Sequence, residues 1–341
     1  MLQVNRASTG LLTAATVGAL LVLSGCGGSS AGSGDTSAAG GQAAADLSGT
    51  VAIDGSSTVE PLSSAAAELF QGQNPGVNVT VGTSGTGGGF QKFCAGETDI
   101  SDASRPISES EIAKCKDSGI EYTQLQVAND ALTVVVNKEN TWAPCLTVEQ
   151  LKKIWENGST VKSWNEVDPA FPDEPLTLYG AGPDSGTFDY FTGVINGKEG
   201  NSRTDYNPTE DDNVTVQGVS GAKGGLGYFG FSYYEENADK LTAVQIDSGA
   251  GCVAPSAATA QDGTYTPLAR PLFIYPSDAG LAKPQVEAFV EFYLENSEQI
   301  AEAVKFIPLT AAQLTQEQAA LDELRARAAG GAPASATTSG G

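Results

Sequence analysis

The chain contains no histidine, and this removes the side chain that most often serves as a general base or zinc ligand. Basic residues are also scarce: 18 Lys and Arg stand against 41 Asp and Glu, and the formal net charge is −23. A polyanion of this kind is a poor partner for nucleic acid or for an anionic lipid surface. Any anion that it binds must therefore be held by local hydrogen-bond donors.

Most catalytic arrangements are excluded on the same grounds. Ser-His-Asp and Cys-His pairs cannot form, and Ser84 is followed by Gly85 and Thr86, which does not fit Gly-x-Ser-x-Gly. The nucleotide phosphate-binding loop Gly-x-x-x-x-Gly-Lys-Ser/Thr is absent too. A glycosidase or phosphohydrolase based on carboxylates is the remaining enzymatic alternative. We expect a protein that is not an enzyme and that has no cofactor and no metal.

An apolar segment near the N-terminus predicts export. Residues 11–23 are too short to cross a bilayer and follow a region whose only charge is Arg6. Leu23-Ser24-Gly25-Cys26 resembles the lipobox of bacterial lipoproteins, in which the cysteine is diacylated. We expect residues 1–25 to be a signal peptide and Cys26 to carry the lipid, palmitate included, on the extracytoplasmic face of the cell membrane. The alternative is an ordinary secretory signal that contains a cysteine.

The ends of the remaining chain are rich in Gly, Ser and Ala and bury too little apolar area to fold. We interpret residues 26–47 as the lipid anchor with a flexible linker and residues 326–341 as a disordered tail. About 280 residues lie between them, enough for two lobes. Four further cysteines allow three pairings, and we favour the two that stay within one lobe, Cys94–Cys115 and Cys145–Cys252. A zinc site is the weaker alternative, because histidine and Cys-x-x-Cys are missing.

Short apolar strands alternate with helical patterns, which predicts an α/β fold. A capping box begins at Thr147, and an apolar stripe at helical spacing lies near the end of the chain. We expect strands at 50–53, 77–81, 131–136 and 176–179. We expect helices at 59–70, after Gly89, after Thr147 (with Leu151, Ile154 and Trp155), at 187–195, and along Val286, Phe289, Val290 and Tyr293.

Three loops rich in glycine and hydroxyl residues follow predicted strands and precede predicted helices. A helix start has up to four unpaired N–H donors and a partial positive charge, so it attracts anions. Any one such loop is ordinarily a helix cap, but strand ends in an open α/β sheet converge on one crevice. We expect the three to form an oxyanion site: Gly55-Ser56-Ser57-Thr58, the run from Gly82 to Gly89 with Ser84 and Thr86, and Asp184-Ser185-Gly186-Thr187.

Arg105, in Ser104-Arg105-Pro106-Ile107, comes just after a predicted strand end. A guanidinium can hold two oxygens of a tetrahedral anion at once. The alternative for Arg105 is a surface ion pair with a neighbouring acid.

Together these motifs resemble the Pst-type phosphate-binding proteins, the substrate-binding subunits of the phosphate ABC importer. The resemblance covers most of residues 48–310 and includes Gly224-Gly225-Leu226-Gly227-Tyr228. It implies a two-lobed periplasmic-binding-protein fold (type II) with the ligand cleft between the lobes. By position it implies phosphate contacts from Ser57, Thr58, Ser84, Ser185, Gly186 and Thr187.

The chain departs from the family pattern at one place. Many members carry an arginine where Ala181 stands here, and we expect Arg105 to replace it. This leaves open which acid accepts the proton of the ligand; Asp102 is our first choice and Asp184 the second.

We expect lobe 1 to comprise residues 48–130 plus 270–325 and lobe 2 to comprise residues 131–269. The first two loops precede Ala131, the third lies in the middle segment, and the resemblance implies a return crossing near Arg270. The predicted function is capture of inorganic phosphate and its delivery to the permease subunits of an ABC importer, by a monomer without nucleic-acid partners. The alternatives are another oxyanion (sulfate, thiosulfate or molybdate) or a surface phosphate sensor or adhesin.

Overall fold

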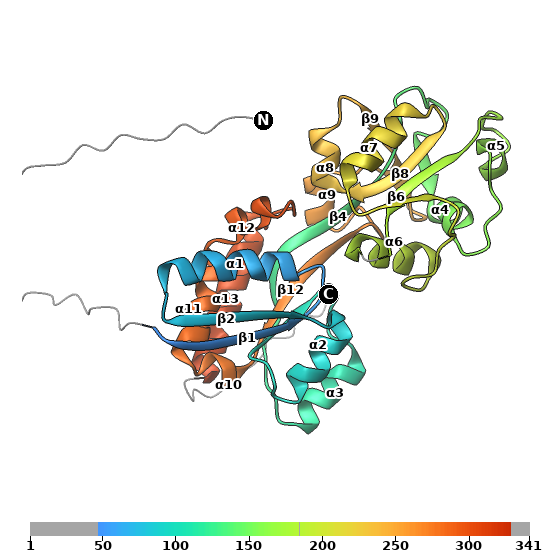
Figure 1. Ribbon diagram of the computed structural model, residues 1–341. Coiled ribbons are helices and arrows are strands. Elements are labelled where there is room, and N and C mark those ends of the chain that lie inside the picture. The colour runs from blue at the N-terminus through green and yellow to red at the C-terminus, as the bar shows by residue number, and fades with distance from the viewer. Residues whose placement is uncertain (1–46, 184, 329–341) are drawn as a thin grey trace, which may run out of the picture. The chain divides into compact units, whose positions relative to one another are not determined.

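The computed structural model describes residues 47–183 and 185–328. The predicted signal peptide, Cys26, nearly all of the linker, Asp184 and the chain from residue 329 lie outside this range. Strands and helices alternate as predicted, and the fold is mixed α/β (Figure 1). The side chains gather in two main apolar cores. One draws on residues 51–128 and 272–324, and we call the part around it lobe 1. The other draws on residues 131–268 and Ile307, and we call the part around it lobe 2.

Three parallel strands of lobe 1 bring two of the predicted loops to one sheet edge. Strand β1 (Gly49–Gly55) lies between β2 (Val77–Thr83) and β3 (Ile100–Ala103). Gly55 pairs in register with Thr83 on one side and with Asp102 on the other. Because the strands run in the same direction, the segments that follow them all leave from this edge.

Helices cover the sheet of lobe 1. The predicted stripe is buried in α11, which confirms that part of the pattern. The last helix continues to Ala328, so residues 326–328 are helical and the predicted tail began three residues too early. The helices of lobe 1 are α1 (Glu60–Gln73), α2 (Gly85–Cys94), α3 (Glu109–Asp117), α10 (Asp278–Leu281), α11 (Pro284–Glu295), α12 (Ser297–Ala303) and α13 (Ala311–Ala328).

Helix α2 begins four residues before Gly89, within the run that the sequence predicted to be a loop. A Cβ on Gly89 would lie 2.5 Å from the Cα of Gly55 and 2.9 Å from the carbonyl oxygen of Asp54. The first turns of α2 thus pack directly on the end of β1, and only glycine leaves room for this approach. Residues 85–89 are therefore a closely packed helix start and not part of the loop that the sequence predicted.

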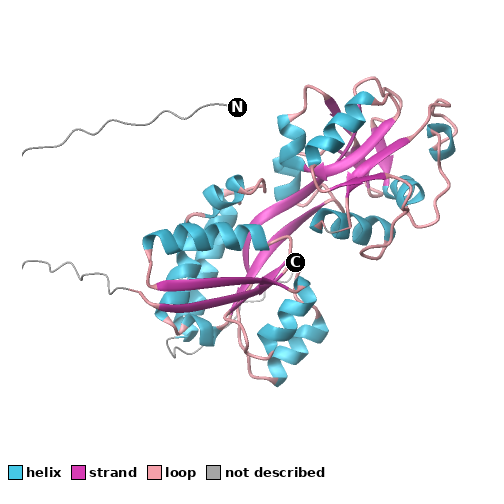
Figure 2. Cartoon of the chain, viewed as in Figure 1, coloured by secondary structure: helices cyan, strands magenta, loops and turns pink. Residues whose placement is uncertain are grey.

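Two long strands belong to both cores. Strand β4 (Leu125–Asn137) extends well beyond the predicted 131–136, because its first half is buried in lobe 1 and its second half in lobe 2. It pairs antiparallel with β12 (Ala269–Pro276), and Arg270 lies opposite Asp130 in this register. Figure 2 shows the two strands running from one lobe into the other.

Lobe 2 continues the sheet from β4 through β8, β6 and β7, while β9 also pairs with β4. The capping box at Thr147 opens α4 as predicted. Trp155 of this helix meets the ring of Phe191 at 5.6 Å and the ring of Tyr228 at 5.0 Å, which fixes α6 against the sheet. The strands of lobe 2 are β5 (Cys145–Thr147), β6 (Thr177–Ala181), β7 (Asn207–Thr209), β8 (Gly225–Gly230), β9 (Leu241–Ala243), β10 (Gln245–Asp247) and β11 (Cys252–Val253); its helices are α4 (Val148–Trp155), α5 (Trp164–Val167), α6 (Gly186–Asn196), α7 (Asp212–Gly221), α8 (Phe231–Glu236) and α9 (Ala257–Gln261).

Both favoured cysteine pairs are disulfides in the structure. Cys94 joins Cys115 between α2 and α3, and Cys145 joins Cys252 between β5 and β11. Among the described residues, no helix combines the length and the apolar character needed to cross a membrane.

Candidate functional site

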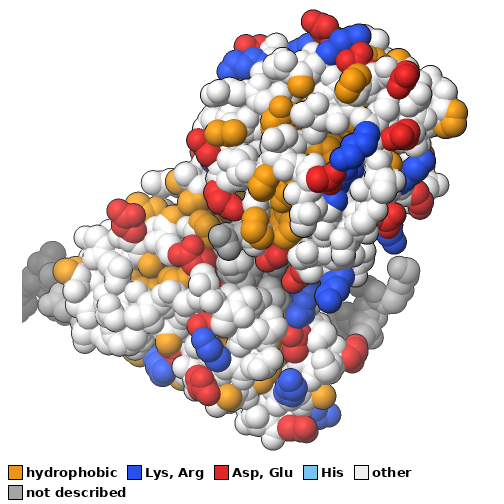
Figure 3. Space-filling view, turned by 45° about the vertical axis from the view of Figure 1, so that its right-hand side comes forward, with side chains coloured by type: hydrophobic (Ala, Val, Ile, Leu, Met, Phe, Trp, Pro, Cys, Tyr) orange, Lys and Arg blue, Asp and Glu red, His pale blue; other side chains and the backbone are white. Residues whose placement is uncertain are grey.

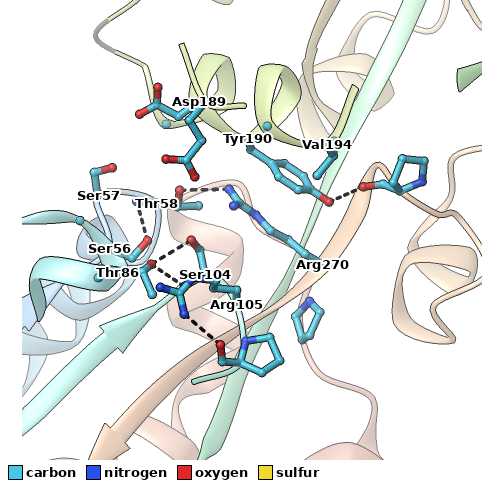
Figure 4. Close-up of a pocket in the computed structure, with 18 of the residues that line it drawn as sticks. Ser56, Ser57, Thr58, Thr86, Ser104, Arg105, Asp189, Tyr190, Val194 and Arg270 are labelled. Atoms are coloured by element: carbon cyan, nitrogen blue, oxygen red, sulfur yellow. Dashed lines mark hydrogen bonds between the residues drawn. The ribbon is translucent and has the colours of Figure 1, made fainter. Parts of the chain in front are cut away.

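The three predicted strand-to-helix junctions border one cavity of about 880 Å³ (Figure 4). The first lies between β1 and α1, the second between β2 and α2, and the third between β6 and α6. The cavity is lined by both lobes and by β12. Of the predicted phosphate-binding residues, those on its lining are Ser56, Ser57, Thr58, Ser84, Thr86, Arg105 and Gly186.

The first junction is held to the end of β3. The backbone N–H of Ser56 donates to the carbonyl oxygen of Asp102 at 3.0 Å. Gly55 has a φ of +154°, and a Cβ there would lie 2.1 Å from that same oxygen, so the close approach requires glycine. The hydroxyl of Ser56 accepts from the N–H of Thr58 at 3.2 Å, while Ser57 is exposed. The turn therefore presents Ser57 and Thr58 to the cavity.

The second junction offers the start of α2. Gly85 and Gly87, in its first turn, line the cavity together with Thr86. The Ser84 hydroxyl donates to Oδ1 of Asp54, whose Oδ2 accepts from Nζ of Lys92 at 2.6 Å. Thr86 and Ser104 share a hydroxyl hydrogen bond of 3.2 Å. These bonds orient the polar side chains around a helix start whose N–H groups remain available to an anion.

The third junction approaches the first across the cavity. A Cβ on Gly186 would lie 3.0 Å from Oγ1 of Thr58 and 3.6 Å from Oγ of Ser57. Ser185 caps α6 by accepting from the N–H of Thr187 at 3.1 Å. Ser185 and Thr187 are not on the cavity lining, so in this structure only Gly186 of the predicted trio faces it.

Asp102 lies beneath the first junction and is completely buried. Its Oδ1 accepts from the Ser63 hydroxyl at 2.9 Å, and Oδ2 has no hydrogen-bond partner among residues 47–183 and 185–328. Burial raises the pKa of Asp102 to about 7. The carboxyl group does not line the cavity, and Asp184, the second choice for the acceptor, lies outside the described residues.

Arg105 lines the cavity but is engaged by an acid. Its Nη1 and Nη2 donate to the two carboxylate oxygens of Glu111, both at 2.9 Å, and its side chain is 45% exposed. The hydrogen bonds to Arg105 and Ser108 hold the pKa of Glu111 down at about 2, although burial opposes them. Arg105 therefore forms the ion pair with a neighbouring acid that the sequence offered as its alternative role.

Several cavity residues were missed from the sequence. Asp189 and Tyr190 lie in the first turns of α6, shortly after Ser185-Gly186-Thr187, and this position near the helix start was the signal available in the sequence. After Arg105, the next arginines that the sequence offers as the cation are Arg203 and Arg270. Arg270 comes from β12 and lines the cavity. Arg203 is buried in lobe 2, where it bonds Asp205 and the carbonyl oxygen of Ile154.

The charge of the lining differs from that of the chain. Acidic and basic side chains are interspersed over the face shown in Figure 3, in a chain that is strongly acidic as a whole. The charged residues on the cavity lining are three basic and two acidic ones: Arg105, Lys198, Arg270, Asp189 and Glu199. The lining itself therefore carries more basic than acidic side chains, although Glu111 and Asp130, which lie off the lining, pair with two of the three basic ones.

Comparison of the chain with known proteins identifies its family, curated relatives and a solved structure of the same fold. A PBP superfamily domain matches residues 40–297. Protein SphX of Synechococcus elongatus is 50% identical over 268 residues, covering 78% of this chain and 79% of its own. The phosphate-binding protein PstS of Staphylococcus saprophyticus is 39% identical over 310 residues, covering 90% and 92%.

A crystal structure of a possible phosphate-binding protein from Planctomyces limnophilus superposes with a TM-score of 0.79. It is 53% identical and covers 82% of this chain and 99% of its own. The predicted periplasmic-binding-protein fold is therefore confirmed. The expectation of a binding protein in place of an enzyme agrees with two of these relatives, which are named a phosphate-binding protein and a possible phosphate-binding protein.

Proposed function

The chain belongs to the PBP superfamily and, within it, to the Pst-type phosphate-binding proteins, and we propose that it captures inorganic phosphate outside the cytoplasm and delivers it to an ABC importer. The observation that carries the proposal is the convergence of three strand-to-helix junctions on one cavity. Their N–H groups and hydroxyls supply donors to every side of a tetrahedral anion.

The predicted contacts fall into two groups. From lobe 1 come Ser56, Ser57, Thr58, Ser84, Thr86 and Arg105, which already border the cavity. From lobe 2 comes the start of α6 with Ser185, Gly186 and Thr187, of which only Gly186 borders it in this structure. We propose that residues 48–130 with 270–325, and residues 131–269, move as two units about β4 and β12. Closing would bring the remaining donors of α6 onto the ligand.

Asp102 is our proposed acceptor for the proton of the ligand. The HPO₄ dianion carries a proton that it can donate and sulfate does not, so an acceptor in the site faces a sulfate lone pair and rejects it. The unpaired Oδ2 of Asp102, below the first junction, supports this role. A raised pKa means that the carboxyl group and the ligand compete for a proton near neutral pH.

Calorimetric titration of the purified chain with phosphate, arsenate and sulfate tests the ligand. We expect phosphate and arsenate to bind and sulfate to be rejected. Binding of sulfate or molybdate without phosphate would refute phosphate as the ligand and favour another oxyanion in the same fold.

The lipid anchor and the delivery step need their own tests. Cys26→Ala should release the protein from the membrane fraction and abolish labelling by palmitate. Loss of the protein should reduce uptake of labelled phosphate at low external concentration. Unchanged uptake in cells that lack it would favour the sensor or adhesin alternative.

A further inference from the structure

We propose that Arg270, oriented by Asp130 and Tyr190, is the principal cation that holds the phosphate. This inference rests on the proposed function and concerns which residue of the site supplies the positive charge. Ala181 removes the arginine that many members of the family carry before α6, and the sequence pointed to Arg105 as its replacement. The structure offers a second arginine in a more enclosed position.

The contacts of Arg270 orient its guanidinium group on three sides. Nε donates to Oδ2 of Asp130 at 3.0 Å, and Nη2 donates to Oγ1 of Thr58 at 3.1 Å. The ring of Tyr190 stacks on the guanidinium, with its centroid 3.6 Å from Cζ. Figure 4 shows Arg270 between Thr58 and Tyr190, directed into the cavity. The group is thus in place before a ligand arrives, and little side-chain entropy is lost on binding.

Arg270 is more enclosed than Arg105, so its charge should attract an anion more strongly. The side chain of Arg270 is 14% exposed, against 45% for Arg105. A charge-assisted hydrogen bond is stronger where water is excluded. Glu111 also engages both terminal nitrogens of Arg105, whereas Asp130 takes only Nε of Arg270. Among residues 47–183 and 185–328, nothing accepts from Nη1 of Arg270, so this nitrogen can donate to the anion together with Nη2.

Arg270 lies at a position in the fold where residues of both lobes contact it. It lies on β12, opposite Asp130 on β4, and these two strands belong to both cores. Thr58 comes from lobe 1 and Tyr190 from lobe 2, so Arg270 touches both sides of the cavity. An anion bound there therefore contacts a cation that residues of both lobes hold in place.

Two acids face Arg270 and must be compatible with an anion. Asp130 neutralises the Nε side, away from the cavity lining, and Asp189 lies on the lining near the guanidinium. A monohydrogen phosphate has one proton to donate, and Asp189 on the lining is an alternative acceptor to Asp102, so it opposes a fully deprotonated anion more than it opposes phosphate. The groups around Arg270 therefore suit a ligand whose oxygens accept hydrogen bonds and which also has a proton to donate.

The test compares matched variants by calorimetric titration with inorganic phosphate. Arg270→Gln removes the charge and should weaken binding by at least roughly thirtyfold, the loss expected for one partner of a buried charged contact. Arg105→Gln removes the other cavity arginine and should weaken binding by less than about tenfold. Arg325→Gln, on α13 and outside the cavity, controls for net charge and should bind as the wild type does.

Arg270→Lys and Asp130→Asn guard against a variant that fails to fold, which thermal melting would reveal. Lysine keeps the charge, but its three donors lie on a single nitrogen and cannot reproduce the planar fork that contacts Asp130 and Thr58 and stacks on Tyr190, so a loss of at least roughly tenfold is expected. In Asp130→Asn the amide oxygen can still accept from Nε of Arg270, but the bond no longer joins two charges and holds the guanidinium less firmly, so phosphate binding should weaken by less than in Arg270→Gln and depend more steeply on salt.

The outcomes separate the two proposals. A wild-type chain that binds no phosphate would refute the proposed function. A wild-type chain that binds phosphate, with Arg270→Gln or Arg270→Lys within about threefold of it, would overturn only the assignment of Arg270. A larger loss in Arg105→Gln than in Arg270→Gln would assign the principal cation to Arg105.

Discussion

Ser63 donates a hydrogen bond of 2.9 Å to Oδ1 of Asp102, a carboxyl group that no solvent reaches. The same hydroxyl lies 3.3 Å from the phenolic oxygen of Tyr293, which connects α1, β3 and α11. One oxygen of the carboxyl group is thereby occupied by the protein. The other, Oδ2, has no partner in the part of the chain that the structure describes. Oδ2 is thus the atom of Asp102 that is left for a further partner, although the carboxyl group does not line the cavity in this structure.

Exchanging the Asp102 carboxyl for an amide should change selectivity more than affinity. Asn keeps an oxygen for Ser63 and places an N–H₂ donor where Oδ2 was, so Asp102→Asn should admit sulfate while phosphate binding weakens less. Titration with sulfate and phosphate measures both. Asp99→Asn is the matched control, because Asp99 is also buried but pairs with Lys283 outside the cavity. Continued rejection of sulfate by Asp102→Asn would move the acceptor elsewhere, to Asp184 first.

Asp102 should also make stability depend on pH. Burial raises its pKa from 3.8 to about 7, so between these values the folded chain holds a proton that the unfolded chain has lost. The contribution of this group to the free energy of unfolding is therefore greatest below about pH 4 and declines as the pH rises to about 7. Asp102→Asn should remove that decline, which amounts to a few kcal/mol at most. Denaturant unfolding of both proteins at pH 4 and pH 8, without phosphate, measures it. Parallel pH profiles would contradict the prediction.

Two glycine-to-alanine changes in helices should have opposite effects. Gly89→Ala places a Cβ 2.5 Å from the Cα of Gly55 and should cost about 1–3 kcal/mol, because backbone must shift. Gly72→Ala, in α1, meets nothing within 4 Å and should stabilise the protein by about 0.5–1 kcal/mol. Thermal or denaturant unfolding compares them. Gly89→Ala should also weaken phosphate binding, because it displaces the start of α2; wild-type affinity with lowered stability would show that this displacement does not matter.

Binding should close the two lobes. The structure leaves Ser185 and Thr187 off the cavity lining, and a ligand that bonds them favours a closed arrangement. Small-angle scattering should give a smaller radius of gyration with phosphate than without it, while sulfate should have no effect. An unchanged profile on saturation with phosphate would show that the site is already closed or that closing is not part of binding.

Much of the fold follows from neighbouring residues, and these parts were predictable. The capping box at Thr147, the apolar stripe of α11 and the strand before each hydroxyl-rich junction are set by contacts within a few positions. The absence of histidine likewise excludes the catalytic mechanisms that use an imidazole, because no arrangement of the chain can supply that side chain. The glycine run of α2 is the exception among local patterns, because its packing partner, the end of β1, lies some thirty residues away.

Which charged residues line the cavity, and which partners they have there, was decided by tertiary structure alone. Arg270 and Thr58 are 212 positions apart, and so no periodicity or motif indicates that they touch. The full burial of Asp102, the ion pair that engages Arg105, and the stacking of Tyr190 on Arg270 arise in the same way. The sequence determined that each junction combines hydroxyl residues with a helix start, because each junction is local. Which cation and which acid complete the site depends on how β4 and β12 cross between the two cores, and packing over long sequence distances determines that.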